Sequence, residues 1–179
     1  GNMNTARDRL SGAGTATAAL AIGGETDNNV GIVEQYDGSS WTEIADLNTA
    51  RKATGGSGTT TAALVFGGND PGGDTDVTES WNGSAWTEVG DLNTTRREVA
   101  GVGAGNTASL AFGGQEAPGA NSKTTENWNG TSWTELADLN TARQAMASSG
   151  INTAALAIGG LIYPPSAAVS ALNETWNGT

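Results

Sequence analysis

The chain has 179 residues, a formal net charge of −11, and neither Cys nor His. The missing Cys excludes disulfides and thiolate metal sites, and the missing His removes the commonest general base and metal ligand. The acidic balance argues against nucleic acid and anionic membrane surfaces as partners, because phosphate binding requires a Lys/Arg footprint. No apolar stretch approaches the length of about 18 residues that would span a membrane.

Four similar units follow one another along the chain. Each begins with Asn-Thr-Ala-Arg or Asn-Thr-Thr-Arg, and the motif recurs every 44 to 47 residues, at Asn4–Arg7, Asn48–Arg51, Asn93–Arg96 and Asn140–Arg143. A period in this range is typical of supersecondary units that bury their apolar faces by stacking on one another. We therefore expect a single domain whose units lie at approximately 4–47, 48–92, 93–139 and 140–179.

The second unit shows which strands each unit contains. A small-residue run at 53–58 and a short apolar run at 61–66, closed by a double glycine, predict the first two strands. A polar loop at 69–76 follows and predicts a turn region. The segments 77–81 and 85–89 predict the third and fourth strands, and the Asn-Gly dipeptide between them predicts a type I′ hairpin turn.

The other units repeat this plan. A double glycine ends the second strand, an aromatic residue stands on the third strand, and a Trp stands on the fourth. The positions are Gly23–Gly24, Gly67–Gly68, Gly113–Gly114 and Gly159–Gly160; Tyr36, Trp81, Trp128 and Trp176; and Trp41, Trp86 and Trp133. Four-stranded units of this length are typical of β-propeller blades.

Together these residues resemble the kelch repeat, and the resemblance covers the whole chain. The Trp-Asn-Gly-(Ser/Thr)-x-Trp-Thr-Glu form is similar to kelch-like repeats of bacterial and phage proteins. The two aromatic positions are five residues apart, a residue or two fewer than is usual in the family. The resemblance implies a propeller fold and a preference for binding, and it implies no chemistry.

We expect an all-β fold: a β-propeller-like array of four kelch-like four-stranded blades, of which the last lacks its outer strand. The sequence stops at Thr179, just after the third strand of the fourth unit, and would leave that strand as an open edge that can template another chain. Three alternatives follow. The chain closes as a four-bladed ring with a short last blade. Or chains complete one another, as a two-chain ring of eight blades or an open head-to-tail series. Or the chain is a fragment of a longer array.

Two charged residues recur in every unit. An Arg stands at the connection into each inner strand, and a Glu precedes the third-strand aromatic by two residues: Arg7, Arg51, Arg96 and Arg143; Glu34, Glu79, Glu126 and Glu174. Recurrence favours a structural role, in which each blade holds its neighbour through an Arg–carboxylate bridge. The alternative is a ring of Arg at one mouth of the central channel that binds an anionic sugar or a carboxylate.

The recurring Trp are expected to form core between blades rather than to stack on sugars. They are Trp41, Trp81, Trp86, Trp128 and Trp133.

Few residues indicate catalysis or metal binding. Asp70, Asp74 and Asp76 in the second unit's polar loop form a weak candidate Ca²⁺ site, with a solvated acidic loop as the default. No pair among the recurring Glu stands out for glycosidase chemistry, and a galactose-oxidase-like copper centre would need Cys and His. We therefore expect a protein that is not an enzyme and uses no cofactor.

Two function classes remain. The first is a structural or assembly subunit that forms a homo-oligomer through the open edge of its last blade, which carries Glu174 and Trp176, on a virion, a cell surface or an extracellular filament. The near-identity of the units favours it, because repeated surfaces give repeated contacts. The alternative is a glycan- or protein-binding module that uses the loops after the double glycines. The long fourth loop, with Tyr163, Pro164 and Pro165, favours this second class.

Overall fold

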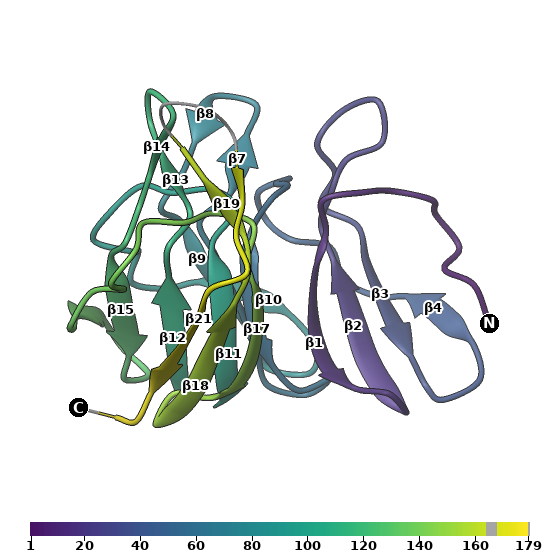
Figure 1. The fold of residues 1–179 in the computed structure, drawn as a ribbon. Coiled ribbons are helices and arrows are strands. Elements are labelled where there is room, and N and C mark those ends of the chain that lie inside the picture. The colour runs from purple at the N-terminus through teal and green to yellow at the C-terminus, as the bar shows by residue number, and fades with distance from the viewer. Residues whose placement is uncertain (164–167, 179) are drawn as a thin grey trace.

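The computed structural model of the chain describes residues 1–163 and 168–178. The fold is all-β, and its four small antiparallel sheets are arranged around a common axis as the four blades of a β-propeller (Figure 1). The described residues include no helix, and hence no helix that could cross a membrane.

Each blade begins with an inner strand next to the axis and continues outward in chain order. Blade 1 contains β1 (Ser11–Thr15), β2 (Ala18–Ile22), β3 (Val33–Tyr36) and β4 (Trp41–Glu43). Blade 2 contains β5 (Gly55–Gly58), β6 (Ala63–Phe66), β9 (Thr78–Trp81) and β10 (Trp86–Glu88). Blade 3 contains β11 (Ala100–Gly105), β12 (Ala108–Phe112), β15 (Thr125–Trp128) and β16 (Trp133–Glu135). Blade 4 contains only β17 (Ala147–Ile151), β18 (Ala154–Ile158) and β21 (Asn173–Trp176) within the described residues.

The loops after the double glycines contain strands that the sequence did not predict. In units 2, 3 and 4 they fold into two-stranded hairpins, which stand at the top of the molecule in Figure 1. The pairs are β7 (Asn69–Asp70) with β8 (Gly73–Asp74), β13 (Gln115–Glu116) with β14 (Ala120–Asn121), and β19 (Leu161–Ile162) with β20 (Ala168–Val169). The turn predicted in the region 69–76 is present, but two strands that were not predicted flank it, because strands of two residues are too short to leave a periodic signal.

The apolar core lies between blades, and the alternation of side chains along the second strands explains its layout. In β6, Ala63 and Val65 pack toward blade 1, whereas Leu64 and Phe66 pack toward blade 3. Both faces of this strand are buried, which is why the run carries no polar residue.

The hairpin turn between the third and fourth strands differs from the predicted type I′ turn. Gly83 has a positive φ of 94°, but Asn82 does not have a positive φ, and a type I′ turn requires both. The Asn82 side chain instead accepts hydrogen bonds from the backbone N–H groups of Ser84 and Ala85, both at 2.9 Å. Asp37 accepts the equivalent bonds from Ser39 and Ser40 in unit 1.

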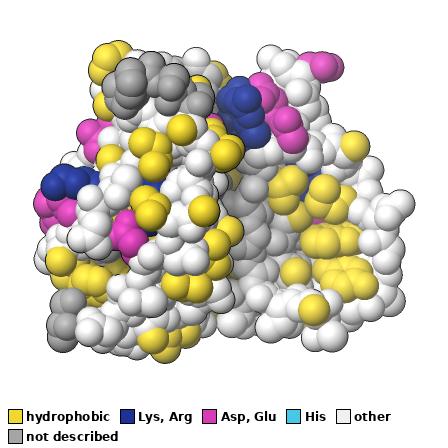
Figure 2. Space-filling model, in the orientation of Figure 1, with side chains coloured by type: hydrophobic (Ala, Val, Ile, Leu, Met, Phe, Trp, Pro, Cys, Tyr) yellow, Lys and Arg dark blue, Asp and Glu magenta, His cyan; other side chains and the backbone are white. Residues whose placement is uncertain are grey.

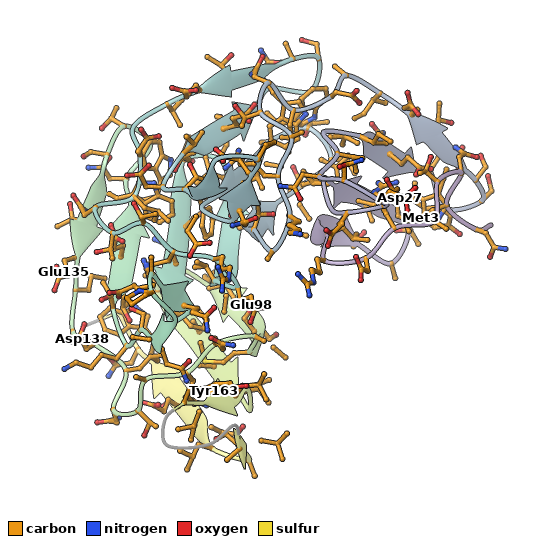
Figure 3. All side chains as sticks on the ribbon, turned by 90° about the horizontal axis from the view of Figure 1, so that it is seen from above. Met3, Asp27, Glu98, Glu135, Asp138 and Tyr163 are labelled. Atoms are coloured by element: carbon orange, nitrogen blue, oxygen red, sulfur yellow. The ribbon has the colours of Figure 1, made fainter. Side chains whose placement is uncertain are left out.

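The ring of blades is open. Inner strands of neighbouring blades pack against each other, β1 on β5, β5 on β11 and β11 on β17, whereas β17 does not pack on β1 in this way. Seen from above, the four blades follow an arc that leaves blade 1 and blade 4 apart at its two ends (Figure 3). Both end blades therefore have one sheet face that no other blade covers.

Candidate functional site: the two ends of the blade array

The recurring Arg and Glu form one buried ion pair in every unit. The distance from a guanidinium nitrogen to a carboxylate oxygen is 2.5 Å for Arg7–Glu34, 2.9 Å for Arg51–Glu79, 2.6 Å for Arg96–Glu126 and 2.6 Å for Arg143–Glu174. Each guanidinium also donates to backbone carbonyls of its own unit, three for Arg7 and two for each of the others; for Arg96 these are Gly113 and Thr124, at 2.7 and 2.8 Å. None of the four recurring Arg side chains is therefore left free to form an anion-binding ring at the channel mouth.

The expectation that these pairs join neighbouring blades was wrong for the side chains. Each Arg and its Glu belong to the same unit, because the Arg segment lies over the third strand of the blade that it enters. The backbone provides the link instead: the carbonyls of Arg51, Arg96 and Arg143 accept from the N–H of the second glycine in the preceding unit, at 2.8 to 2.9 Å. One residue thus fixes its own blade through its side chain and the preceding blade through its carbonyl.

The double glycine is required by this contact. Gly67 has a φ of 61°, and a Cβ placed on it would lie 2.5 Å from the Arg96 carbonyl oxygen. Only glycine combines the left-handed backbone with so close an approach.

Burial and hydrogen bonding act in opposite directions on these groups. Burial opposes ionisation of Glu34, but the N–H of Asn4 and the guanidinium of Arg7 outweigh it, so that the pKa of Glu34 lies below its usual value. The pKa of Glu174 is lowered through the equivalent contacts with Asn140 and Arg143, again against burial. Both carboxylates are therefore held in the charged form that their partners require.

The fourth-strand Trp lie between blades. Trp86 is 6% exposed, and its Nε1 donates to the Ala45 carbonyl of unit 1 at 3.1 Å. Trp133 is 5% exposed, packs edge-on against Phe66 at a centroid distance of 4.9 Å, and donates from Nε1 to Thr78 Oγ1 at 3.1 Å. Trp81 and Trp128 are buried beside them on the third strands.

The same positions are uncovered at the ends of the array. Trp41 stacks on Tyr36 at 5.1 Å as its counterparts do, but it is only half-buried, and its Nε1 has no hydrogen-bond partner among the described residues. On blade 4, Ile158 is 36% exposed, whereas Phe112 and Phe66 at the equivalent position are 3% and 0% exposed. The space-filling view shows hydrophobic side chains at the surface over both end blades (Figure 2).

The backbone contacts between units are also open at both ends. Ala53, Glu98 and Ala145 each donate from N–H to the carbonyl 44 to 47 residues earlier, at Arg9, Ala53 and Glu98 respectively. These four residues have φ of 50° to 54°, an unusual conformation for residues other than glycine. Within the described part of the chain, the Arg9 N–H and the Ala145 carbonyl have no partner, and neither has the Gly160 N–H. These contacts could not be predicted from the sequence, because the four residues (Arg, Ala, Glu and Ala) have no common side-chain type that would mark the position.

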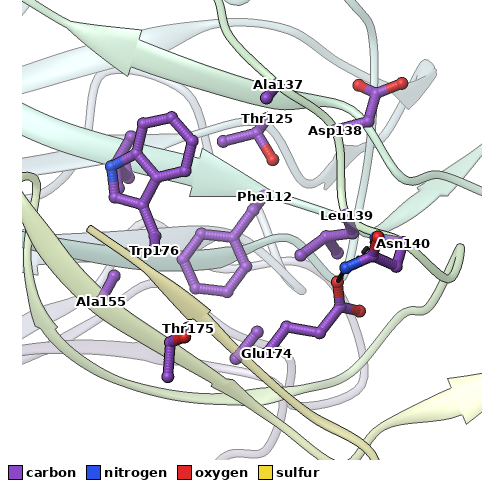
Figure 4. A pocket seen from close by; sticks show the side chains of 12 residues that line it. Phe112, Thr125, Ala137, Asp138, Leu139, Asn140, Ala155, Glu174, Thr175 and Trp176 are labelled. Atoms are coloured by element: carbon purple, nitrogen blue, oxygen red, sulfur yellow. Dashed lines mark hydrogen bonds between the residues drawn. The ribbon is translucent and has the colours of Figure 1, made fainter. Parts of the chain in front are cut away.

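A cleft of about 200 Å³ lies between blade 3 and blade 4, beside β21. Its walls include Phe112 and Leu139 of unit 3 and Trp176 of β21, with Thr125, Asn140 and Glu174 at its margin (Figure 4). Glu174 and Trp176, predicted as partner-binding residues, therefore both line this cleft.

The other predicted site residues do not come together. Asp74 accepts from Asn69 and pairs with Arg97 at 2.7 Å, Asp70 caps the turn at Gly72, and Asp76 lies near Thr95. Among the described residues no three carboxylates come together in a group that could hold a metal ion, and the candidate Ca²⁺ site is therefore not supported. Tyr163 is 40% exposed in the fourth loop, whereas Pro164 and Pro165 lie outside the described residues.

The chain matches no protein-family model and no curated protein. The β-propeller arrangement therefore rests on the structure itself.

Proposed function

We propose that the chain is a non-catalytic, kelch-like assembly subunit that associates head to tail with other copies of itself, blade 4 of one copy packing on blade 1 of the next. The observation that carries the proposal is that one interface occurs three times inside the chain and that its two halves lie uncovered at the two ends. Such a contact is heterologous, and it builds either a ring or an open series.

The uncovered halves match in chemistry as well as position. Where Trp133 of one blade covers Phe66 of the blade before it, Trp41 of a second copy would cover Ile158. The Gly160 N–H would donate to the Arg7 carbonyl of that copy, as Gly114 donates to Arg143 within the chain. The Arg9 N–H of that copy would donate to the Ala145 carbonyl, as Ala145 donates to Glu98 within the chain.

The kelch-like assignment is supported by the roles of its signature residues. The double glycine brings two units together, and the fourth-strand Trp fills the space between blades. A repeated interface of this kind suits a virion, cell-surface or extracellular assembly, where identical contacts are used many times.

Cysteine cross-linking tests the proposal directly, since the chain contains no Cys of its own. Thr54 and Ser11 touch across the blade 1–blade 2 interface, Oγ1 to Oγ at 2.9 Å, and the repeat places Leu10 and Ala147 in the same relation between copies. The double variant Leu10→Cys/Ala147→Cys should form covalent multimers under oxidation, and each single variant should form none larger than a dimer.

The variant Ser11→Cys/Thr54→Cys is the matched control, because its disulfide forms within one chain. A monomer with an internal disulfide in the Leu10→Cys/Ala147→Cys variant would show that the ring closes within one chain and would contradict the proposal. So would failure to cross-link under conditions in which the control does.

The exposure of the fourth loop favours a second function, binding of a protein or glycan. Val169 in β20 is 88% exposed and Tyr163 is 40% exposed, whereas the described loops of units 2 and 3 expose no large hydrophobic side chain of this kind. A glycan array probed with the chain and with Tyr163→Ala tests it: a signal that the substitution removes supports the loop as a site, and equal signals contradict it.

A further inference from the structure

The cations that are not buried gather in one place. Of the eight Lys and Arg, four form the buried pairs with Glu, and Lys123 pairs with Asp138 at 3.1 Å. The other three all line one pocket of about 310 Å³. Its lining residues are Arg9, Lys52, Ala53, Asn69, Arg97 and Glu98. Figure 2 shows Lys and Arg side chains beside Asp and Glu side chains at the top of the molecule, in the middle of the view.

The repeat explains how this pocket forms. Arg9, Ala53 and Glu98 occupy the same position in successive units, and all three have the left-handed backbone described above. Ala53 donates its N–H to the Arg9 carbonyl at 2.8 Å, and Glu98 donates to the Ala53 carbonyl at 2.7 Å. Ala53 therefore stands between Arg9 and Glu98, and its short side chain leaves space between the two longer ones. Seen from above, Glu98 lies on the concave side of the arc of blades (Figure 3).

Two of the three cations already have carboxylate partners. Lys52 Nζ lies 2.5 Å from Glu25 Oε1, and Arg97 donates to Asp74 Oδ1 at 2.7 Å. Each pair joins one unit to the loop of the preceding unit. These contacts between blades account for the charges of Lys52 and Arg97.

Arg9 and Glu98 have no such partners. The Arg9 side chain is 56% exposed, and its guanidinium lies 3.8 Å from Glu25, which already binds Lys52. Within the described residues, the Glu98 carboxylate has no hydrogen bond and no ion pair. The pocket thus presents one positive and one negative group that the fold does not use, on either side of Ala53.

We propose that this pocket binds a small zwitterion of the amino-acid type, whose carboxylate pairs with Arg9 and whose ammonium group pairs with Glu98. A simple anion would leave Glu98 unpaired beside it, and a simple cation would do the same to Arg9. The volume of about 310 Å³ lies at the lower end of the range for ligand pockets and suits a single amino acid. All lining residues except Ala53 are polar or charged, which favours a polar side chain on the ligand.

This proposal goes beyond assembly and does not depend on it. The lining residues come from units 1, 2 and 3, and none belongs to blade 4. Binding can therefore be measured whether or not copies of the chain associate.

The test is a titration of the isotope-labelled chain with L-serine, followed through the backbone amide signals in NMR spectra. The amides of Ala53 and Glu98 should shift to saturation. N-acetyl-L-serine lacks the ammonium charge and L-serinamide lacks the carboxylate. Each should bind at least about tenfold more weakly, as expected for the loss of a hydrogen bond between charged groups.

Two variants assign the ends of the ligand. Glu98→Gln should remove the preference for L-serine over N-acetyl-L-serine, and Arg9→Gln should remove the preference for L-serine over L-serinamide. Lys123→Gln is the matched control, because it removes an exposed cation outside the pocket and should leave binding unchanged. Amide signals away from the pocket show that each variant is folded.

Absence of saturable shifts in the unsubstituted chain would overturn the proposal. So would N-acetyl-L-serine that binds as tightly as L-serine, because the pocket would then recognise only an anion. A Glu98→Gln variant that still prefers L-serine would show that Glu98 does not bind the ammonium group, which also contradicts the proposal.

Discussion

At the scale of single residues, stability depends on side chains that serve two blades at once. Trp86 fills the interface between blades 1 and 2 and uses its indole N–H to hold the Ala45 carbonyl. In units 2, 3 and 4 the buried Arg binds its own blade through the guanidinium and the preceding blade through its carbonyl. Because each such residue contributes to the contacts of two blades, we expect its substitution to destabilise the neighbouring unit as well as its own.

Trp86→Ala should lower the free energy of unfolding by about 3–5 kcal/mol, because it leaves a cavity in the core between two blades. Trp41→Ala is the comparison, since Trp41 has the same role in its unit but is half-exposed, and its loss should destabilise the monomer far less. Urea unfolding of the two variants measures the difference. Equal losses would mean that the interface between blades is not where Trp86 acts.

The lowered pKa of Glu34 predicts a dependence of stability on pH. Because its pKa is lower in the folded chain than in the unfolded chain, Glu34 stabilises the fold fully above its unfolded pKa of about 4.3. This contribution is lost as the pH falls through the folded value. Glu34→Gln should therefore lower stability at pH 7 and reduce the further loss between pH 5 and pH 3, in thermal melts across that range. A variant with the wild-type acid profile would show that Glu34 is not the responsible group.

At the scale of elements, the third and fourth strands are joined by a turn in which an Asn or Asp side chain accepts hydrogen bonds from the backbone. Asn82 and Asn129 each accept from two following backbone N–H groups, and Asp37 does so in unit 1. The Asn in the sequence motif is explained by this cap rather than by a left-handed backbone.

Asn82→Ala should cost about 1 kcal/mol of stability, because it removes the acceptor of these bonds. Asn82→Asp should be close to neutral, since unit 1 uses Asp37 at the same place. Denaturant midpoints measured side by side give the comparison, and an Asp variant as unstable as the Ala variant would rule out the capping role.

The strands and their order could be predicted from the sequence because every blade repeats the same signals. Glycine-bounded apolar runs, an Asn-Gly turn and paired aromatics predicted all four blades, including the three-stranded last one. The loop hairpins such as β7–β8 could not be predicted, since their strands are too short for periodicity. The pairing of each recurring Arg with a recurring Glu was predicted. That the two belong to the same unit was not predicted, because sequence spacing does not show which blade the segment carrying the Arg packs on.

At the scale of the whole molecule, the chain is an open array whose ends are unequal and complementary. Blade 1 presents the Tyr36–Trp41 pair, and blade 4 presents Ile151 and Ile158, which are 45% and 36% exposed. Internal blades bury the groups at the equivalent positions. The open ends were not predictable from the sequence, which is equally compatible with a closed ring.

Ile158→Asp should shift the chain toward the monomer while leaving its melting temperature as a monomer nearly unchanged, because a charge on this face opposes burial against a second copy. Val169→Asp is the control: it introduces the same charge at a residue that is 88% exposed in the fourth loop and should leave the mass unchanged. Sedimentation velocity of both variants distinguishes these results. If Ile158→Asp associates like the unsubstituted chain, blade 4 does not form the contact through this face.

The central claim is that the interface between blades continues from one copy to the next. It is tested most directly by the absolute mass in solution, from native mass spectrometry and light scattering over a concentration series. We predict a dimer, or a ladder of multiples of 17.9 kDa that lengthens with concentration. A mass of 17.9 kDa at every concentration would contradict the claim and would mean that the two faces remain uncovered or close on each other within one chain.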